Sequence, residues 1–268
     1  MYRGFELSLP SKGLLSDKTY AQLKQQSRGL YKEFHEETLN NIANLKIDTT
    51  SVINGDVVEN AWFPKEYYTS ANTPDEPFHI FLSHSHLDKE FAMCIAQLLK
   101  NQANINVFID SLVWGYRNEL IEKLYASALE QDLERTGLRD SIVSHVDCML
   151  SKSLMEMIDS CECMFFLNTP QSVSAFNVSK GTLSPWIYSE LEASAKLGIN
   201  TPDRIIAQHM KKYATVHDEK PYFRMEHNVS TRHLTKIDNA DFCAWLVVMQ
   251  ADCHTPGEAL DLLYEMKD

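Results

Sequence analysis

Phe78-His-Ile-Phe-Leu-Ser-His-Ser-His86 is the stretch of this chain that decides the fold. Its apolar run, Ile80 to Leu82, gives way at once to small polar and imidazole side chains. A short continuous apolar run is typical of a strand that is buried on both faces, as in a parallel sheet. The abrupt change predicts that this strand delivers its last side chains to a functional edge.

Strand and helix patterns alternate from this point to the end of the chain. The apolar runs predict a first strand at 79–83 and further strands at 105–110, 161–167, 204–209 and, more weakly, 229–237. Helical spacing of apolar residues predicts helices at 88–101, 119–135, 141–159, 184–198 and 241–250, with another after Thr255. Ser85 and Asp88 resemble a capping box at the start of the first helix, and Thr255 with Glu258 resembles one at the last.

This alternation implies right-handed crossovers and a mostly parallel sheet. We therefore expect an α/β fold, a flavodoxin-like open sheet of about five parallel strands with helices on both faces. In the strand order 2-1-3-4-5 the winding direction changes between strands one and three, and ligands bind there beyond the carboxyl ends of the strands. The loops after 79–83 and 161–167 should meet at that point.

The first quarter of the chain differs from the rest. Residues 1–75 are expected to form an N-terminal helical extension, because 17–44 is polar with a loose apolar stripe at helical spacing. A partly ordered leader is the alternative. The main domain is expected to span 76–268, with a helical insertion around 119–159 and helices at its C-terminal end.

A second informative stretch, Ser184-Pro-Trp-Ile-Tyr-Ser-Glu190, has the features of a helix start. Ser184 suits the N-cap, Pro185 suits the first helical position, and Gly198 is a plausible stop. Trp186 and Glu190 are spaced i, i+4, so the carboxylate should lie beside the indole on one helix face. This placement predicts a chemical role for the carboxylate.

The composition argues against several classes of protein. The chain of 268 residues carries a formal net charge of −12, which is unfavourable for binding nucleic acid or an anionic membrane. No apolar run approaches the roughly 20 residues that span a bilayer, and no secretory leader pattern is evident. We therefore expect a cytoplasmic protein whose six scattered cysteines are reduced.

Two residue pairs could suggest a metal site. Cys161-Glu-Cys163 and His84-Ser-His86 each place two potential ligands close together in sequence. Neither pair is accompanied by the further ligands that a structural or catalytic metal site needs. We expect no metal.

Three segments together resemble a Toll/interleukin-receptor (TIR) domain, and more narrowly the bacterial TIR proteins associated with defence against phage. They are Ile80-Phe-Leu-Ser-His-Ser-His-Leu-Asp88, Phe108-Ile-Asp-Ser111 with its following loop, and Ser184-x-Trp-x-x-x-Glu190. The resemblance covers roughly 77–215 and, more loosely, the C-terminal part, and its segments occur in the right order. The helices at 119–159 are longer than the single crossover helix of a minimal TIR domain.

The resemblance implies an enzyme, an NAD+ nucleosidase (NADase) that cleaves the bond between nicotinamide and ribose. It implies release of ADP-ribose or of a cyclic ADP-ribose-type signal in antiphage immunity, with NAD+ as substrate and no cofactor. Glu190 would be the catalytic residue. Expected partners are further copies of the chain, through TIR–TIR contacts, and a downstream effector that responds to the product. The residues expected to bind substrate are Ser83, His84, Ser85, Asp110, Trp114, Tyr116 and Trp186.

The same residues also have ordinary structural interpretations. Glu190 could be an ordinary solvated glutamate near a helix N-terminus, where its charge favours the helix dipole. Trp186 could be a core residue, and Trp114 with Tyr116 could anchor a loop or contact another subunit. At the level of function, the alternatives are a non-catalytic TIR adaptor that signals by assembly and a nucleoside hydrolase or transferase.

Overall fold

The computed structural model describes residues 1–10, 13–30, 32–46, 55–62, 78–112, 116–130, 136–173, 181–182, 184–206, 227–228, 230–253 and 255–267. At its centre lies a sheet of five parallel strands in the order β3-β2-β4-β1-β7. The strands are β1 (Arg3–Ser8), β2 (Ile80–Ser83), β3 (Val107–Ile109), β4 (Cys163–Leu167) and β7 (Thr235–Asp238). The expected open parallel α/β sheet is confirmed.

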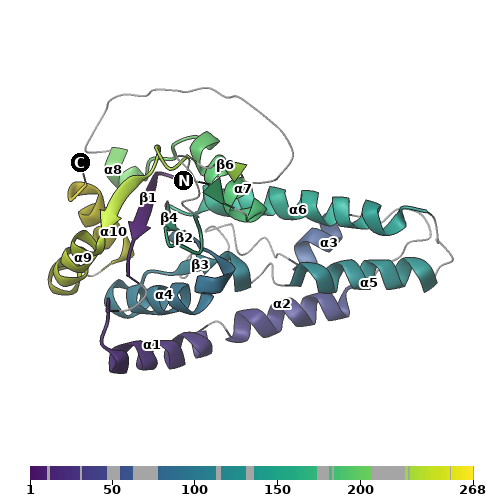
Figure 1. The fold of residues 1–268 in the computed structure, drawn as a ribbon, viewed down its shortest axis with the longest axis horizontal. Helices are drawn as coiled ribbons and strands as arrows, with labels where there is room; N and C mark the ends of the chain where they lie inside the picture. The colour runs from purple at the N-terminus through teal and green to yellow at the C-terminus, as the bar shows by residue number, and fades with distance from the viewer. Residues whose placement is uncertain are drawn as a thin grey trace.

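Helices cover both faces of this sheet (Figure 1). They are α1 (Asp17–Leu30), α2 (Lys32–Asn44), α3 (Gly55–Trp62), α4 (Lys89–Ala103), α5 (Arg117–Glu130), α6 (Leu138–Ser160), α7 (Pro185–Lys196), α8 (Asp203–Ile206), α9 (Asn239–Asp252) and α10 (Pro256–Glu265). Two short 3₁₀ turns, η2 (His86–Asp88) and η3 (Asp110–Leu112), follow β2 and β3, and a two-stranded ribbon pairs β5 (Gly181–Thr182) with β6 (His227–Asn228). The capping box at Thr255 is confirmed at the start of α10.

The core has two parts because successive strand residues face opposite sides of the sheet. Leu82 belongs to the apolar cluster formed with α4, α9 and α10, and its neighbour Phe81 belongs to the cluster formed with α5, α6 and α7. Within the first cluster Trp245 is fully buried and donates its indole N–H to the Ala259 carbonyl at 2.8 Å. Ser83 follows Phe81 by two residues, so it faces the α7 side at the end of β2.

The strand β1 was not predicted from the sequence. This strand lies inside the sheet, paired with both β4 and β7, where the predicted strand 204–209 would have been. Gly4 permits the close packing there, since a Cβ on it would meet the Leu234 side chain at 2.5 Å. The first residues of the chain are therefore part of the sheet, although the rest of the described N-terminal segment is helical as expected.

Other expectations about individual elements were wrong in detail. Over 203–206 the chain is the short helix α8, while 207–209 lies outside the described residues. Ser85 caps the 3₁₀ turn η2, where its hydroxyl accepts from the Leu87 N–H at 3.4 Å, and it does not cap α4. Asp88 is the N-cap residue of α4, yet its carboxylate makes no cap hydrogen bond.

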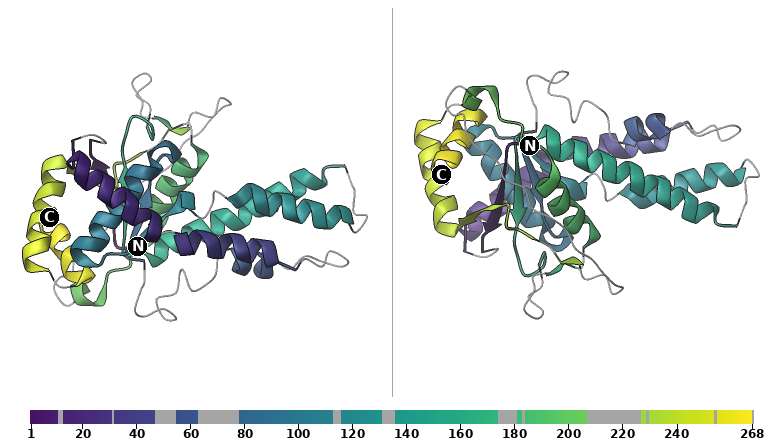
Figure 2. Two further views of the ribbon diagram at one scale, coloured as in Figure 1. Left: turned by 90° about the horizontal axis from the view of Figure 1, so that it is seen from below. Right: turned by 90° about the horizontal axis from the view of Figure 1, so that it is seen from above.

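The helices α5 and α6 run side by side and extend away from the sheet, with α2 and α3 alongside them (Figure 2). A buried Glu59 on α3 ties this arm together, because it accepts from Ser153 at 2.7 Å and from Lys152 at 2.8 Å on α6. None of the helices in the described ranges is both long and apolar enough to cross a membrane.

Candidate active site

Three strand ends meet at one edge of the sheet and form the candidate site. β2 ends at Ser83, β3 is followed directly by Asp110, and β4 is followed by a turn that contains Thr169. β2 and β4 are neighbours even though β3 lies between them in sequence, so the winding direction of the sheet changes here as expected. This is the point at which open α/β sheets bind ligands.

The helix α7 brings Glu190 to this edge. Ser184 caps the helix by accepting from the Ile187 N–H at 3.3 Å, and Pro185 occupies its first turn. Ile187 and Leu191 are buried against the sheet, which fixes the rotation of the helix. The fully buried Glu190 then accepts a hydrogen bond from the β2 residue Ser83, whose Oγ lies 2.5 Å from Glu190 Oε2. Two segments 107 residues apart therefore meet directly.

Glu190 has an unusual electrostatic environment. Burial raises the pKa of its carboxyl well above the usual range, and the negative charge of nearby Asp110 raises it further. The hydrogen bond from Ser83 acts in the opposite direction because it favours the ionised form. In the ligand-free protein, Glu190 therefore holds its proton at pH values where an exposed glutamate is ionised.

His84 also contacts Asp110. Its Nε2 is 2.9 Å from the Ser111 hydroxyl, while its Nδ1 is 3.2 Å from the Leu82 carbonyl and 3.0 Å from Asp110 Oδ1. The geometry directs the Nδ1–H at the Leu82 carbonyl, and Asp110 Oδ1 lies beside it as an ion-pair partner. Burial favours the neutral ring, but Asp110, the Leu82 carbonyl and the charge of Asp88 together outweigh burial and raise the pKa of His84.

The structure adds three polar residues that the sequence analysis did not select. Lys89, at the start of α4, is half-buried, and its Nζ lies 3.4 Å from the Ser111 carbonyl. Burial lowers the pKa of Lys89, and the charge of Asp110 opposes that shift. Thr169 donates to buried Asp88 at 2.5 Å and so joins the loops after β2 and β4. A lysine in the first turn of a helix opposes the helix dipole, and this was the available sequence signal for Lys89.

The remaining predicted substrate contacts have different positions. Ser85 is buried in its capping role, and Trp186 is half-buried against the α6–α7 side of the core. Tyr116 is only 8% exposed and belongs to the same apolar cluster, so it is a core residue and offers no free ring face for stacking. Trp114 lies outside the described residues.

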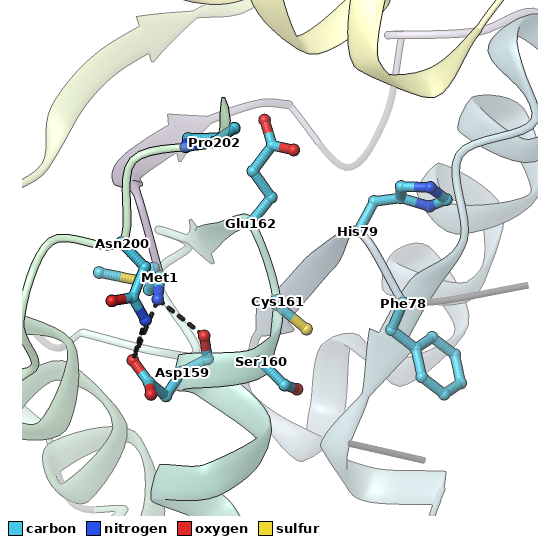
Figure 3. Close-up of a pocket in the computed structure, with 9 residues that line it drawn as sticks. All are labelled: Met1, Phe78, His79, Asp159, Ser160, Cys161, Glu162, Asn200 and Pro202. Carbon is cyan, nitrogen blue, oxygen red and sulfur yellow. Dashed lines mark hydrogen bonds and ion pairs between the residues drawn. The ribbon is translucent and has the colours of Figure 1, made fainter. Parts of the chain in front are cut away.

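A separate pocket of about 210 Å³ lies at the opposite edge of the sheet (Figure 3). Both of its carboxylates already have partners: Glu162 accepts from Tyr264 at 2.7 Å, and Asp159 accepts from Asn200 at 2.9 Å. The nearby His79 accepts from the Asn106 N–H at 3.0 Å. This pocket is smaller than the ~300–1,000 Å³ typical of ligand sites.

All six cysteines are free thiols. Across the parts of the chain that the structure describes, no three His, Cys, Asp or Glu side chains are grouped so as to hold a metal ion.

Comparison of the chain with protein-family models, with curated proteins and with solved structures found no match.

Proposed function

We propose that this protein cleaves the N-glycosidic bond between nicotinamide and ribose in NAD+, as the resemblance to TIR domains implies. The observation that carries the proposal is the buried carboxyl of Glu190, held by Ser83 at the carboxyl ends of β2 and β4. A buried carboxyl at a ligand-binding edge suits a reaction in which positive charge develops on a sugar.

The reaction needs little acid catalysis because the leaving group is already a cation. The bond between C1′ of the ribose and the ring nitrogen breaks, and its electron pair leaves with neutral nicotinamide. The oxygen of water then bonds to C1′ and loses a proton to solvent, which gives ADP-ribose. Attack by an internal hydroxyl or an adenine nitrogen would give a cyclic product instead.

In this proposal the site residues have separate roles. The ionised carboxylate of Glu190 accepts hydrogen bonds from the ribose hydroxyls and stabilises the positive charge that develops at C1′. Ser83 fixes the position of that carboxylate. Glu190 is fully buried in the ligand-free chain, so the substrate reaches it only after the site opens. We attribute that opening to contacts between copies of the chain.

The test is to incubate the protein with NAD+ over a wide range of protein concentrations and to measure free nicotinamide. We expect the release per protomer to be low in dilute solution and to rise as the chains associate, with chromatography under the same conditions reporting assembly. Release that does not depend on concentration would contradict the role of assembly. If nicotinamide is absent at every concentration while the protein assembles, the adaptor alternative is favoured. Cleavage of nucleosides but not NAD+ would favour a nucleoside hydrolase or transferase.

A further inference from the structure

Two buried carboxyl oxygens in the candidate site have no hydrogen-bond donor among the described residues. They are Oε1 of Glu190 and Oδ1 of Asp110. Glu190 is 0% exposed and Asp110 is 7% exposed, so water does not freely solvate either group. Unsatisfied buried polar atoms are rare in folded proteins and call for an explanation.

A single proton shared by the two carboxyl groups explains why both oxygens lack another donor. The side chains of Glu190 and Asp110 lie within hydrogen-bonding reach of each other. Two ionised carboxylates in contact inside a protein repel strongly, whereas a carboxyl and a carboxylate that share a proton form a hydrogen bond. The proton supplies the donor that neither oxygen otherwise has.

The charges around the pair favour a proton on the Glu190 side. His84 lies 3.0 Å from Asp110, and Lys89 acts on Asp110 electrostatically, so both basic groups stabilise a negative charge there. Glu190 has the neutral donor Ser83 and no described cation.

Other titratable groups lie near the pair, on the loop after β2, on β1 and on α7 itself. Asp88 accepts from Thr169, and Glu6 accepts from Asn168 at 2.6 Å. Glu6 shares the cross-strand row of Ser83, with Phe166 of β4 between them. On the solvent side of α7, Glu192 forms an ion pair with Lys196 at 2.8 Å. None of these groups is among the causes that shift the pKa of Glu190, whereas Asp110 is.

We propose that Asp110 is a positioning residue that shares one proton with Glu190 and keeps the site uncharged at Glu190 until a cationic ligand enters. This inference rests on the proposed function for its ligand. The positively charged nicotinamide ribosyl group would stabilise ionised Glu190, and the shared proton would pass to solvent. Ligand binding would then release one proton and would become tighter as the pH rises toward the pKa of Glu190.

Infrared spectroscopy of the ligand-free protein tests the shared proton directly. We expect the wild-type protein at neutral pH to show the carbonyl band of a protonated carboxylic acid, shifted in heavy water and absent from Glu190→Gln. The band should disappear as the pH rises. Glu192→Gln is the matched control on the same helix, and its spectrum should keep the band.

Two further variants separate a positioning role from a purely structural one. Asp110→Asn should lower the pH at which the band disappears by at least about one unit, because it removes the neighbouring negative charge. Ser83→Ala should raise that pH, because it removes the donor that favours the ionised form. If Asp110→Asn does not fold, Ser83→Ala still tests the proposal. A general loss of stability would not shift the midpoint of the band in opposite directions in the two variants.

Absence of the band from the wild-type protein, or an unchanged midpoint in the folded variants, would overturn the proposal. The measurement uses no substrate, so its outcome is separate from that of the NAD+ assay. A band without nicotinamide release would leave proton sharing standing and remove the proposed function. Nicotinamide release without the carbonyl band would leave the proposed function standing and remove proton sharing.

Discussion

Replacing Glu190 with glutamine is expected to reduce nicotinamide release from NAD+ at least about 100-fold, the size of effect seen when a buried group that stabilises transition-state charge is removed. Glutamine has nearly the same shape and retains an oxygen that can accept from Ser83. Its amide can also donate to Asp110, so the fold should be preserved. The variant loses only the negative charge that would stabilise the ribosyl cation. Nicotinamide release under assembling conditions is the measurement.

The matched control is Glu192→Gln. Glu192 lies two residues away on α7, where its carboxylate is partly exposed and paired with Lys196. We expect this variant to release nicotinamide within about twofold of wild type, since an exposed ion pair contributes little. Circular dichroism and thermal unfolding should verify that both variants are folded. Equal release by folded Glu190→Gln and wild type would move the chemistry to another residue.

Replacing Phe5 with alanine is expected to lower the free energy of unfolding by about 3–5 kcal/mol, the usual cost of removing a buried aromatic ring. Phe5 is fully buried in the middle of β1. Its ring makes an edge contact with Phe165 at 5.6 Å and stacks on Tyr264 at 6.0 Å. Removing the ring would leave a cavity between the sheet and α10. Urea denaturation of both proteins measures the loss.

Ser8→Ala is the control for this prediction because Ser8 is the exposed last residue of the same strand. A change within about 0.5 kcal/mol is expected there. If Phe5→Ala were as stable as Ser8→Ala, the first residues of the chain would not be part of the folded sheet.

The fold was predictable from the sequence where strands are continuously apolar. β2, β3 and β4 have no polar residue before their last position, which is typical of strands covered on both faces. β1 lacks that signal, since Arg3 and Glu6 interrupt its apolar residues and Gly4 weakens strand propensity. Its place in the sheet depends on pairing with β4 and β7, and such pairing between distant segments has no local signature.

The candidate site was partly predictable for a related reason. The predicted strand ends and the capped helix indicated that Ser83 and Glu190 lie close together, because parallel strands present their carboxyl ends at one edge. The contact between Asp110 and Glu190, and the burial of both, depends on how α7 packs on the sheet. Tyr116 illustrates the limit: an aromatic residue beside glycine in a loop is equally compatible with a ligand contact and with a core anchor, and here it is buried.

The most direct test of the account is a structure of the protein with an NAD+ analogue whose ribose ring oxygen is replaced by carbon, so that it cannot be hydrolysed. We predict that the hydroxyls of the nicotinamide-side ribose will lie within hydrogen-bonding distance of Glu190, beyond the carboxyl ends of β2 and β4. An analogue bound at the opposite edge, in the pocket beside His79, would contradict the account.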